Sequence, residues 1–321
     1  MNIDRITAAA TRLKGHAVRT PLLNAPLLDA DAGRRIFVKA EALQKTGSFK
    51  YRGARAAITA LTDEARAKGV IAFSSGNHAQ GVALAARETG SSAVIIMPAD
   101  APRLKIENTR ALGAKVVLYN RETEDRDEIG ARLATDRGLT LIKPFDNPDV
   151  IAGQGTTGLE IAEQATEAGI TEADVLVCCG GGGLTSGIAL ALEARAPGLR
   201  ARPVEPEGFD DTTRSLATGT RQTNEKRVGS ICDAIVTPSP GELTFPILKR
   251  LCGPGIVVSD EDAQRAMALA FSRLKLVLEP GGAVALAAAL FHTESDADII
   301  VVASGGNVDA PVFQDALDRF G

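Results

Sequence analysis

One lysine and two glycine-containing turns are the residues of this chain best suited to chemistry. Lys50 stands in the segment 48–53 (SFKYRG), four consecutive glycines fill positions 180–183, and a second turn spans 74–78 (SSGNH). A lysine amine can form a Schiff base with an aldehyde, and the backbone N–H groups of a turn that opens a helix bind phosphate or carboxylate. Together these segments predict a site for an aldehyde that also carries a phosphate.

The glycine run follows an apolar segment at 175–179 and precedes a helix-like segment that starts near Leu184. Glycine accepts positive φ and lets a ligand approach the backbone, so several N–H groups can converge on one phosphate. The Walker ending Gly-Lys-Ser/Thr is absent, and the dinucleotide pattern does not fit. A tight turn without a ligand needs only one or two glycines. The four therefore favour a phosphate without a nucleotide, as in pyridoxal 5′-phosphate (PLP).

Two further turns can supply polar groups to such a cofactor. The N–H groups and hydroxyls of residues 74–78 suit a carboxylate, and the Asn77 amide suits a phenolic oxygen. The other interpretation of this segment is a helix cap followed by a core histidine, His78. Ser304 ends the apolar run 299–303, so it is expected at the sheet edge where ligands bind in open α/β folds. Its neutral hydroxyl suits a pyridine nitrogen.

Short apolar runs that alternate with helix-like segments must position these residues. Unbroken apolar runs are typical of strands buried on both faces, and they occur at 70–73, 93–97, 115–119, 175–178 and 299–303. Helix-like patterns occur at 77–88, 103–112, 149–168 and 259–276. The alternation predicts an α/β fold with parallel sheets covered by helices. We expect a small domain at 68–141, and a large domain formed by 1–67 and 142–321.

The composition of the chain limits the classes of partner that it can bind. With 321 residues, 45% hydrophobic content and a net charge of −4, the chain shows neither a basic nucleic-acid stripe nor a polybasic membrane face. No apolar stretch reaches a membrane span, and the N-terminus has no apolar signal core, so we expect a cytoplasmic protein. The four cysteines have no CxxC spacing, which favours reduced core residues over a structural zinc site. The expected partner is a small molecule.

Five segments in order resemble the fold-type II PLP enzymes: 45–54 (KTGSFKYRGA), 75–81 (SGNHAQG), 150–156 (VIAGQGT), 180–183 (GGGG) and 304–309 (SGGNVD). Within that family the chain is most similar to threonine/serine dehydratases and serine racemases. The resemblance covers nearly the whole chain. It implies a tryptophan synthase β-like fold of two open parallel-sheet α/β domains with the cofactor between them, and a homodimer.

The resemblance also implies roles for individual residues. Catalysis falls to Lys50, which removes the α-proton as general base, and to Ser75 as a second base. The implied cofactor-binding residues are Lys50, Phe49, Asn77, Gly180, Gly181, Gly182, Gly183, Leu184 and Ser304. The implied substrate-binding residues are Ser74, Ser75, Gly76, Asn77 and His78. The predicted reaction is elimination of water from threonine, serine or 3-hydroxyaspartate, which gives a 2-oxo acid and ammonia.

Two features leave alternatives open. Ser75 stands where catabolic threonine dehydratases tend to carry alanine and where racemases carry their second base, so a serine or aspartate racemase is the alternative function. The segment 205–211 (EPEGFDD) resembles the divalent-cation loop of serine racemase-like members. Carried over, Glu205, Asp211 and the Phe209 carbonyl form an oxygen set for Mg²⁺ or Ca²⁺. The other interpretation of this loop is an acidic surface segment.

The substrate itself is not specified by these patterns. A second substrate carboxylate, as in 3-hydroxyaspartate, needs a cation near the β-carbon. The candidates in the sequence are Arg126, Arg214, Arg221, Lys226 and Arg227.

Overall fold

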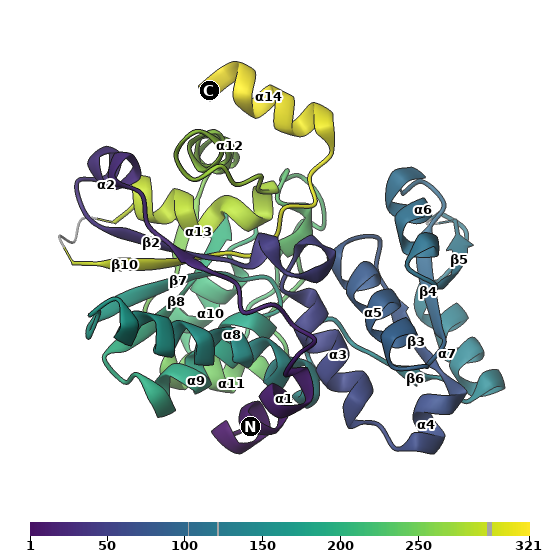
Figure 1. The fold of residues 1–321 in the computed structure, drawn as a ribbon. Helices are drawn as coiled ribbons and strands as arrows, with labels where there is room; N and C mark the ends of the chain where they lie inside the picture. Colours follow the sequence, from purple (N-terminus) through teal and green to yellow (C-terminus); the bar gives the residue numbers. More distant parts are fainter. Residues whose placement is uncertain (102, 121, 294–296) are drawn as a thin grey trace.

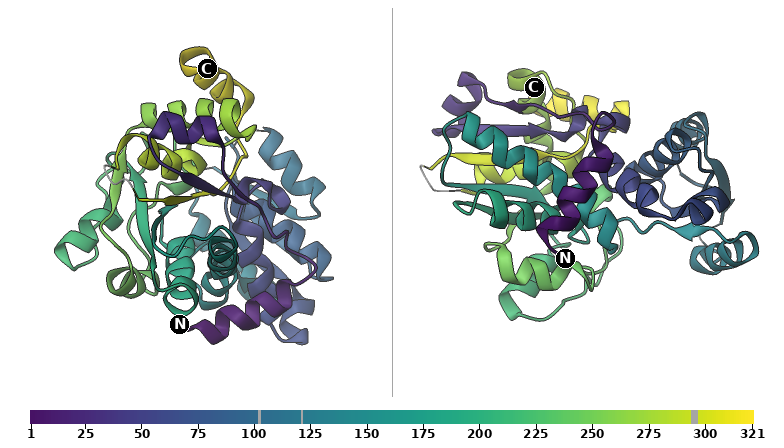
Figure 2. Two further views of the ribbon diagram at one scale, coloured as in Figure 1. Left: turned by 60° about the vertical axis from the view of Figure 1, so that its left-hand side comes forward. Right: turned by 60° about the horizontal axis from the view of Figure 1, so that its bottom comes forward.

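The computed structural model describes residues 1–321 except 102, 121 and 294–296. Two lobes, each built around its own sheet, make up the molecule (Figure 1). The larger sheet has the strand order β1-β2-β10-β7-β8-β9, and the smaller has the order β5-β4-β3-β6. The right-hand view in Figure 2 separates the two lobes, with the smaller lobe at one side of the larger.

The larger sheet is parallel except at one edge, where β1 pairs antiparallel with β2. Its centre is β10, which pairs with β2 on one side and with β7 on the other. The strands are β1 (Leu22–Leu23), β2 (Ile36–Ala40), β7 (Ala173–Cys178), β8 (Leu199–Pro206), β9 (Ile256–Val258) and β10 (Ile299–Ala303). Chain segments from both ends of the sequence therefore complete this sheet.

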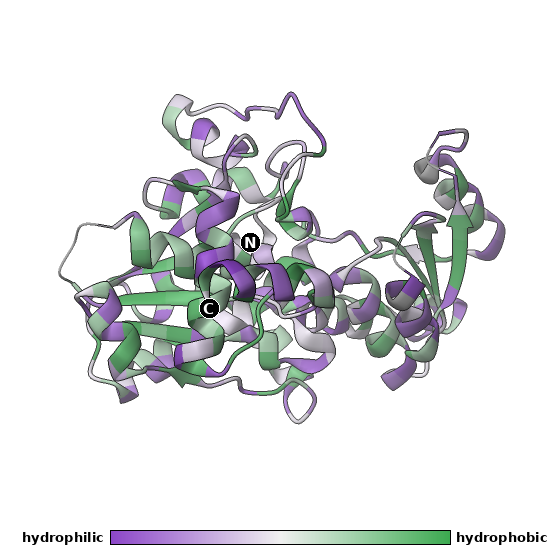
Figure 3. Ribbon diagram, turned by 90° about the horizontal axis from the view of Figure 1, so that it is seen from above, coloured by the Kyte–Doolittle hydropathy of each residue, from purple (hydrophilic) through white to green (hydrophobic). Residues whose placement is uncertain are grey.

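Helices cover both faces of the larger sheet (Figures 1 and 2). One of them, α13, is apolar on all sides, as expected for a helix that lies between the sheet and α12. Figure 3 shows hydrophobic colouring on the strands of both sheets. The helices of this lobe are α1 (Ile3–Leu13), α2 (Pro26–Ala32), α3 (Lys50–Ala60), α8 (Pro148–Glu167), α9 (Gly183–Arg195), α10 (Asp211–Thr218), α11 (Thr244–Leu251), α12 (Asp260–Leu269), α13 (Pro280–Phe291) and α14 (Ala310–Phe320).

The smaller sheet is entirely parallel. Its strands are β3 (Val70–Phe73), β4 (Ala93–Pro98), β5 (Lys115–Tyr119) and β6 (Thr140–Leu141), and its helices are α4 (Asp63–Lys68), α5 (Asn77–Glu88), α6 (Arg103–Ala111) and α7 (Arg126–Arg137). Apolar residues of α3, among them Tyr51 and Ile58, share a core with this sheet. The domain boundaries at 68 and 141 stay a prediction, because α3 belongs to both lobes by its packing.

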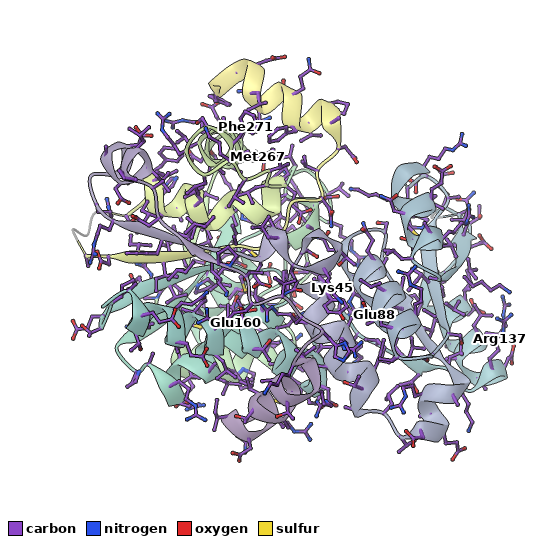
Figure 4. All side chains as sticks on the ribbon, in the orientation of Figure 1. Lys45, Glu88, Arg137, Glu160, Met267 and Phe271 are labelled. Atoms are coloured by element: carbon purple, nitrogen blue, oxygen red, sulfur yellow. The ribbon has the colours of Figure 1, made fainter. Side chains whose placement is uncertain are left out.

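A buried ion network fixes α3 to the larger lobe. The guanidinium of Arg52 donates to both oxygens of Glu41 at 2.8 Å and to both oxygens of Glu160 at 2.7 and 2.8 Å. On the other side, Lys45 pairs with Glu88 of α5 at 2.8 Å, and Figure 4 shows these two side chains next to each other. The start of α3 is thus held from two directions.

Candidate active site

A cavity of about 290 Å³ lies between the lobes, where the carboxyl ends of strands from both sheets meet. All the residues predicted to bind cofactor or substrate line it. From the larger lobe come Phe49, Lys50, Gly180, Gly181, Gly182, Gly183, Leu184 and Ser304. From the smaller lobe come Ser74, Ser75, Gly76, Asn77 and His78. Segments distant in sequence are therefore assembled around one space, as expected for an open α/β site.

Lys50 is the first residue of α3, and its side chain projects into this cavity. Its Nζ donates to the Pro144 carbonyl at 3.1 Å and lies 5.0 Å from the centre of the Phe49 ring. Burial lowers the pKa of Lys50 to about 8, and the nearby Cys178 and Glu279 only partly oppose that effect. About a tenth of this amine is then neutral at pH 7, far more than for an ordinary lysine, and the neutral form suits both nucleophilic attack on an aldehyde and proton abstraction.

The glycine loop joins β7 to α9, which begins at Gly183. Gly182 has φ +87°, a conformation that favours glycine, and a Cβ on Gly181 would overlap the Phe145 ring. Among the hydrogen bonds of the described residues, none uses the backbone N–H groups of residues 180–184. These donors and the positive end of α9 thus form a ready site for a phosphate.

The turn 74–78 joins β3 to α5. The N–H of Gly76 donates to Ser74 Oγ at 3.1 Å, whereas the N–H groups of Ser75 and Asn77 have no partner within the described residues. The His78 ring donates from Nε2 to the Ile142 carbonyl at 2.8 Å, and burial lowers its pKa to about 3. His78 is therefore a neutral, internally anchored ring rather than a charged ligand for the substrate.

The amide of Asn77 is held on both sides. Its Nδ2 donates to Glu279 Oε1 at 2.6 Å, and its Oδ1 accepts from Asn307 Nδ2 at 2.7 Å. One hydrogen of the Asn77 NH₂ group remains for a ligand in the cavity. Burial raises the pKa of Glu279 to about 7, so this carboxyl is partly protonated at neutral pH.

Ser304 follows β10, and Cys178 ends the adjacent strand β7. The Cys178 thiol donates to Ser304 Oγ at 3.1 Å, and the Ser304 carbonyl accepts from the Phe49 N–H at 3.1 Å. Both side chains line the cavity and are 3% exposed. No hydrogen bond between described residues uses the hydroxyl hydrogen of Ser304, which leaves that hydrogen for a ligand.

Comparison with known proteins identifies the family. The family model described as pyridoxal-phosphate dependent enzyme matches residues 13–305. The chain belongs to the pyridoxal-phosphate dependent enzymes. It is 43% identical to an L-threo-3-hydroxyaspartate ammonia-lyase from Pseudomonas sp over 97% of both chains. This similarity and the matched range confirm the predicted family.

Solved structures of such PLP enzymes share the fold. A threonine deaminase from T.th. superposes with a TM-score of 0.91 at 44% identity, covering 96% of this chain and 99% of that one. A maize serine racemase gives a TM-score of 0.91 at 37% identity, covering 99% of this chain and 97% of that one. The predicted fold class is therefore confirmed. Separately, no helix in the described parts of this PLP enzyme is long and apolar enough to cross a membrane.

Several charged or reactive residues of the cavity escaped prediction. They are Lys105, Cys178, Asp233 and Glu279. Lys105, on α6, lies 3.9 Å from the Asp309 carboxylate and is the one lining cation besides Lys50 among the described residues. Arg214 and Arg221 instead bond to neighbours outside the cavity, and the side chain of Arg126 lies outside the described residues. Of these residues, only Glu279 has a local sequence signal, because it stands directly before Pro280-Gly281-Gly282 at the start of a helix.

The predicted metal ligands lie outside this cavity, around the end of β8. Glu205 is fully buried and accepts from the N–H groups of Thr212 and Thr213 at 2.8 and 2.7 Å. Asp211 Oδ1 accepts from Asn224 Nδ2 at 2.5 Å, but Asp211 Oδ2 is buried without a partner. Within the described residues, no group of three or more His, Cys, Asp or Glu side chains is arranged to hold a metal.

Burial dominates the electrostatics of this acidic pair, although the nearby Arg214 partly opposes the effect at Asp211. Burial, followed by the neighbouring Asp211, raises the pKa of Glu205 to about 8. Burial likewise raises the pKa of Asp211 to about 7. These two side chains are not part of an acidic surface, which was the other interpretation of this loop, because Glu205 is 0% and Asp211 1% exposed.

Proposed function

We propose that this PLP enzyme is an ammonia-lyase that eliminates water from a β-hydroxy amino acid and releases a 2-oxo acid and ammonia. The observation that carries the proposal is the convergence of Lys50, the free N–H groups of residues 180–184, Asn77 and Ser304 on one cavity between the lobes. Relatives named as hydroxyaspartate and threonine ammonia-lyases support it.

The residues of the cavity suit the parts of PLP. The N–H groups of the glycine loop would hold its phosphate, the remaining Asn77 amide hydrogen its phenolic oxygen, and the Ser304 hydroxyl its ring nitrogen. Lys50 would hold it covalently. When bound, PLP supplies an electron sink for the negative charge that develops on the substrate α-carbon.

The chain's own residues would then handle the substrate and its proton. The N–H groups at the start of α5 would bind the substrate α-carboxylate, as helix N-termini bind anions. With the cofactor bound, the amine of Lys50 would remove the substrate α-proton as general base. The lowered pKa of Lys50 supports this role, because a neutral amine is the form that accepts a proton.

We further propose 3-hydroxyaspartate as the preferred substrate. Lys105 lines the cavity, and its ion pair with the Asp309 carboxylate is long, at 3.9 Å, so its ammonium group suits a second substrate carboxylate. A charge-assisted hydrogen bond contributes about 1.5–3 kcal/mol, which corresponds to roughly 10- to 100-fold in kcat/KM. Two relatives, 42% and 43% identical, are named as L-threo-3-hydroxyaspartate ammonia-lyases.

A panel of the stereoisomers of 3-hydroxyaspartate, threonine and serine tests both statements. Each is scored by kcat/KM for 2-oxo acid and ammonia. We expect 3-hydroxyaspartate to exceed the monocarboxylates by about 10-fold or more. Equal values would reject the substrate preference, and an absence of 2-oxo acid from every substrate would reject the lyase.

The second candidate is an amino-acid racemase. The Ser75 hydroxyl lines the same cavity as Lys50, so two groups that can carry a proton face one ligand space. Relatives named as serine racemases support this alternative. Chiral analysis of the substrate recovered from the same panel separates it from the lyase, because racemisation returns the opposite enantiomer whereas elimination consumes the substrate.

A structural divalent cation at Glu205, Asp211 and the Phe209 carbonyl is also part of the proposal. Two observations support this cation. It would give the buried Asp211 Oδ2 a partner, and its charge would lower the raised pKa values of Glu205 and Asp211. Mg²⁺ and Ca²⁺ both suit such an oxygen set. The homodimer and the cytoplasmic location stay predictions.

A further inference from the structure

We propose that Cys178 is a positioning residue for the cofactor: its thiol occupies one lone pair of Ser304 Oγ and so directs the Ser304 hydroxyl hydrogen toward the pyridine nitrogen. The proposal rests on PLP binding, which the proposed function also requires. It goes beyond that function because it assigns a role to a side chain whose sequence pattern indicated only core packing.

The contact is a consequence of strand order. Strands β7 and β10 are parallel neighbours, with Val177 opposite Val302, so Cys178 and Ser304 leave the sheet at the same edge. Their side chains meet at 3.1 Å between Sγ and Oγ. Both are 3% exposed, so bulk water does not compete for the hydroxyl.

The direction of this hydrogen bond decides what Ser304 presents to a ligand. A serine hydroxyl has one hydrogen and two lone pairs, and a thiol is a weak donor and a weak acceptor. If Ser304 donated to sulfur, it would show only lone pairs to the cavity, which a pyridine nitrogen without a proton cannot use. If Cys178 donates, the Ser304 hydrogen is free to point into the cavity.

The geometry has Cys178 as the donor, and the protonation state of its thiol permits this. Burial raises the pKa of Cys178 to about 11, even though the contact with Ser304 and the nearby Lys50 act in the opposite direction. The thiol therefore keeps its hydrogen across the neutral range. A cofactor nitrogen that accepts from Ser304 stays unprotonated, so the pair selects one electronic state of the ring.

The test uses the holoenzyme loaded with PLP that carries ¹⁵N in its pyridine ring. The ¹⁵N chemical shift of that ring nitrogen reports its hydrogen bond directly, and titration of PLP into cofactor-free protein gives Kd. We compare wild type, Cys178→Val, Cys178→Ser and Ser304→Ala. Cys252→Val is the matched control, because Cys252 is also a buried thiol but does not line the cavity.

In Cys178→Val, we expect the ¹⁵N chemical shift of the ring nitrogen to move from the wild-type value toward the value in Ser304→Ala. The Kd for PLP should rise about 2- to 10-fold, the range of one net hydrogen bond. Cys178→Ser, which restores a donor, should stay within about 2-fold of wild type, as should Cys252→Val. If valine does not fold at this site, Cys178→Ala is compared with Cys178→Ser in its place.

Two outcomes overturn the inference. A ring-nitrogen shift and Kd unchanged in Cys178→Val would show that Ser304 needs no help from the thiol. Equal changes in Cys178→Val and Cys178→Ser would show that sulfur, and not a hydrogen-bond donor, is required. If wild type bound no PLP at all, the proposed function would fail first, and that result is distinct from either of these.

Discussion

The stability of the metal-free protein should fall as pH rises, because two buried carboxyl groups must ionise. The pKa of Glu205 is about 8 against an ordinary value of 4.5, and that of Asp211 is about 7 against 3.8. The folded state therefore binds more protons than the unfolded state across this window, and the free energy of unfolding decreases toward alkaline pH. The stabilisation is complete below about pH 4 and is lost as pH rises through about 8.

The magnitude follows from the Glu205 shift. At about 1.4 kcal/mol per pH unit, a rise from 4.5 to about 8 corresponds to a ceiling of about 5 kcal/mol once this group is ionised. A divalent cation reverses the loss, because its ligands must be deprotonated and its affinity therefore increases with pH. At a hundredfold excess over Kd, the cation stabilises the fold by about 2.7 kcal/mol.

Thermal unfolding near pH 6 and near pH 8.5 measures the loss of stability with pH and its reversal by a cation. At each pH, one sample contains chelator and another contains added Mg²⁺ or Ca²⁺. With chelator, Tm should drop between the two pH values, and the cation should restore it by about 5 °C, mainly at the higher pH. Glu205→Gln should remove the cation response, because it is a neutral isostere. The matched control is Glu207→Gln, in the same loop but exposed, which should behave as wild type.

The reasoning is refuted if chelator and cation give the same Tm at both pH values in wild type. A cation response that survives in Glu205→Gln would also refute it, because the bound ion would then lie elsewhere.

Three further substitutions test residues of the cavity. Lys50→Ala should remove the covalent link to PLP, seen as loss of the protein-bound visible band, and lower kcat by about 100-fold or more, since both nucleophile and base are lost; wild-type turnover would contradict this. Ser75→Ala should suppress any racemisation much more than elimination, measured by chiral analysis; equal losses would make Ser75 a substrate-binding residue. Lys105→Gln should lower kcat/KM for 3-hydroxyaspartate about 10- to 100-fold and for serine only a few-fold, with Arg103→Gln on the exposed face of α6 as control; a uniform loss would count against carboxylate recognition.

The longer, largely apolar runs of the sequence were predictable as strands, whereas β8, which carries two arginines, was not. The runs 70–73, 115–119 and 299–303 coincide with β3, β5 and β10. Strand β8 was missed because Arg200 and Arg202 interrupt its pattern and Pro203 cannot donate to a ladder. The segment 259–276, predicted as one helix, is α12 followed by a π-turn at Ala270–Leu274, and Lys275 ends it with φ +60°. Its apolar pattern continues past the helix because Leu276 is also buried.

The candidate site was predictable where a motif carries its own geometry. Glycine-rich turns after apolar strands indicate anion sites locally, and all these segments do line the cavity. Lys105 and Cys178 were not predictable, and Glu279 was marked only by its place before a helix start, because the contacts of all three join distant segments. Cys178 meets Ser304 only through the order of β7 and β10, and Glu279 meets Asn77 only because α13 starts beside the smaller lobe. Charge and residue type alone do not specify such pairs.

The strand order of the larger sheet also sets the order in which the chain can fold during synthesis. The smaller sheet is built from residues 70–141 in one continuous stretch, so it can form early. Among the described strands β10 is synthesised last, so Ile36 of β2 must wait for Ile299 of β10. Such distant pairing is slow because loop closure precedes any gain from contact. Ser304 leaves the ribosome directly after this strand, so we expect a nascent chain to acquire its cofactor only after β10 has been synthesised.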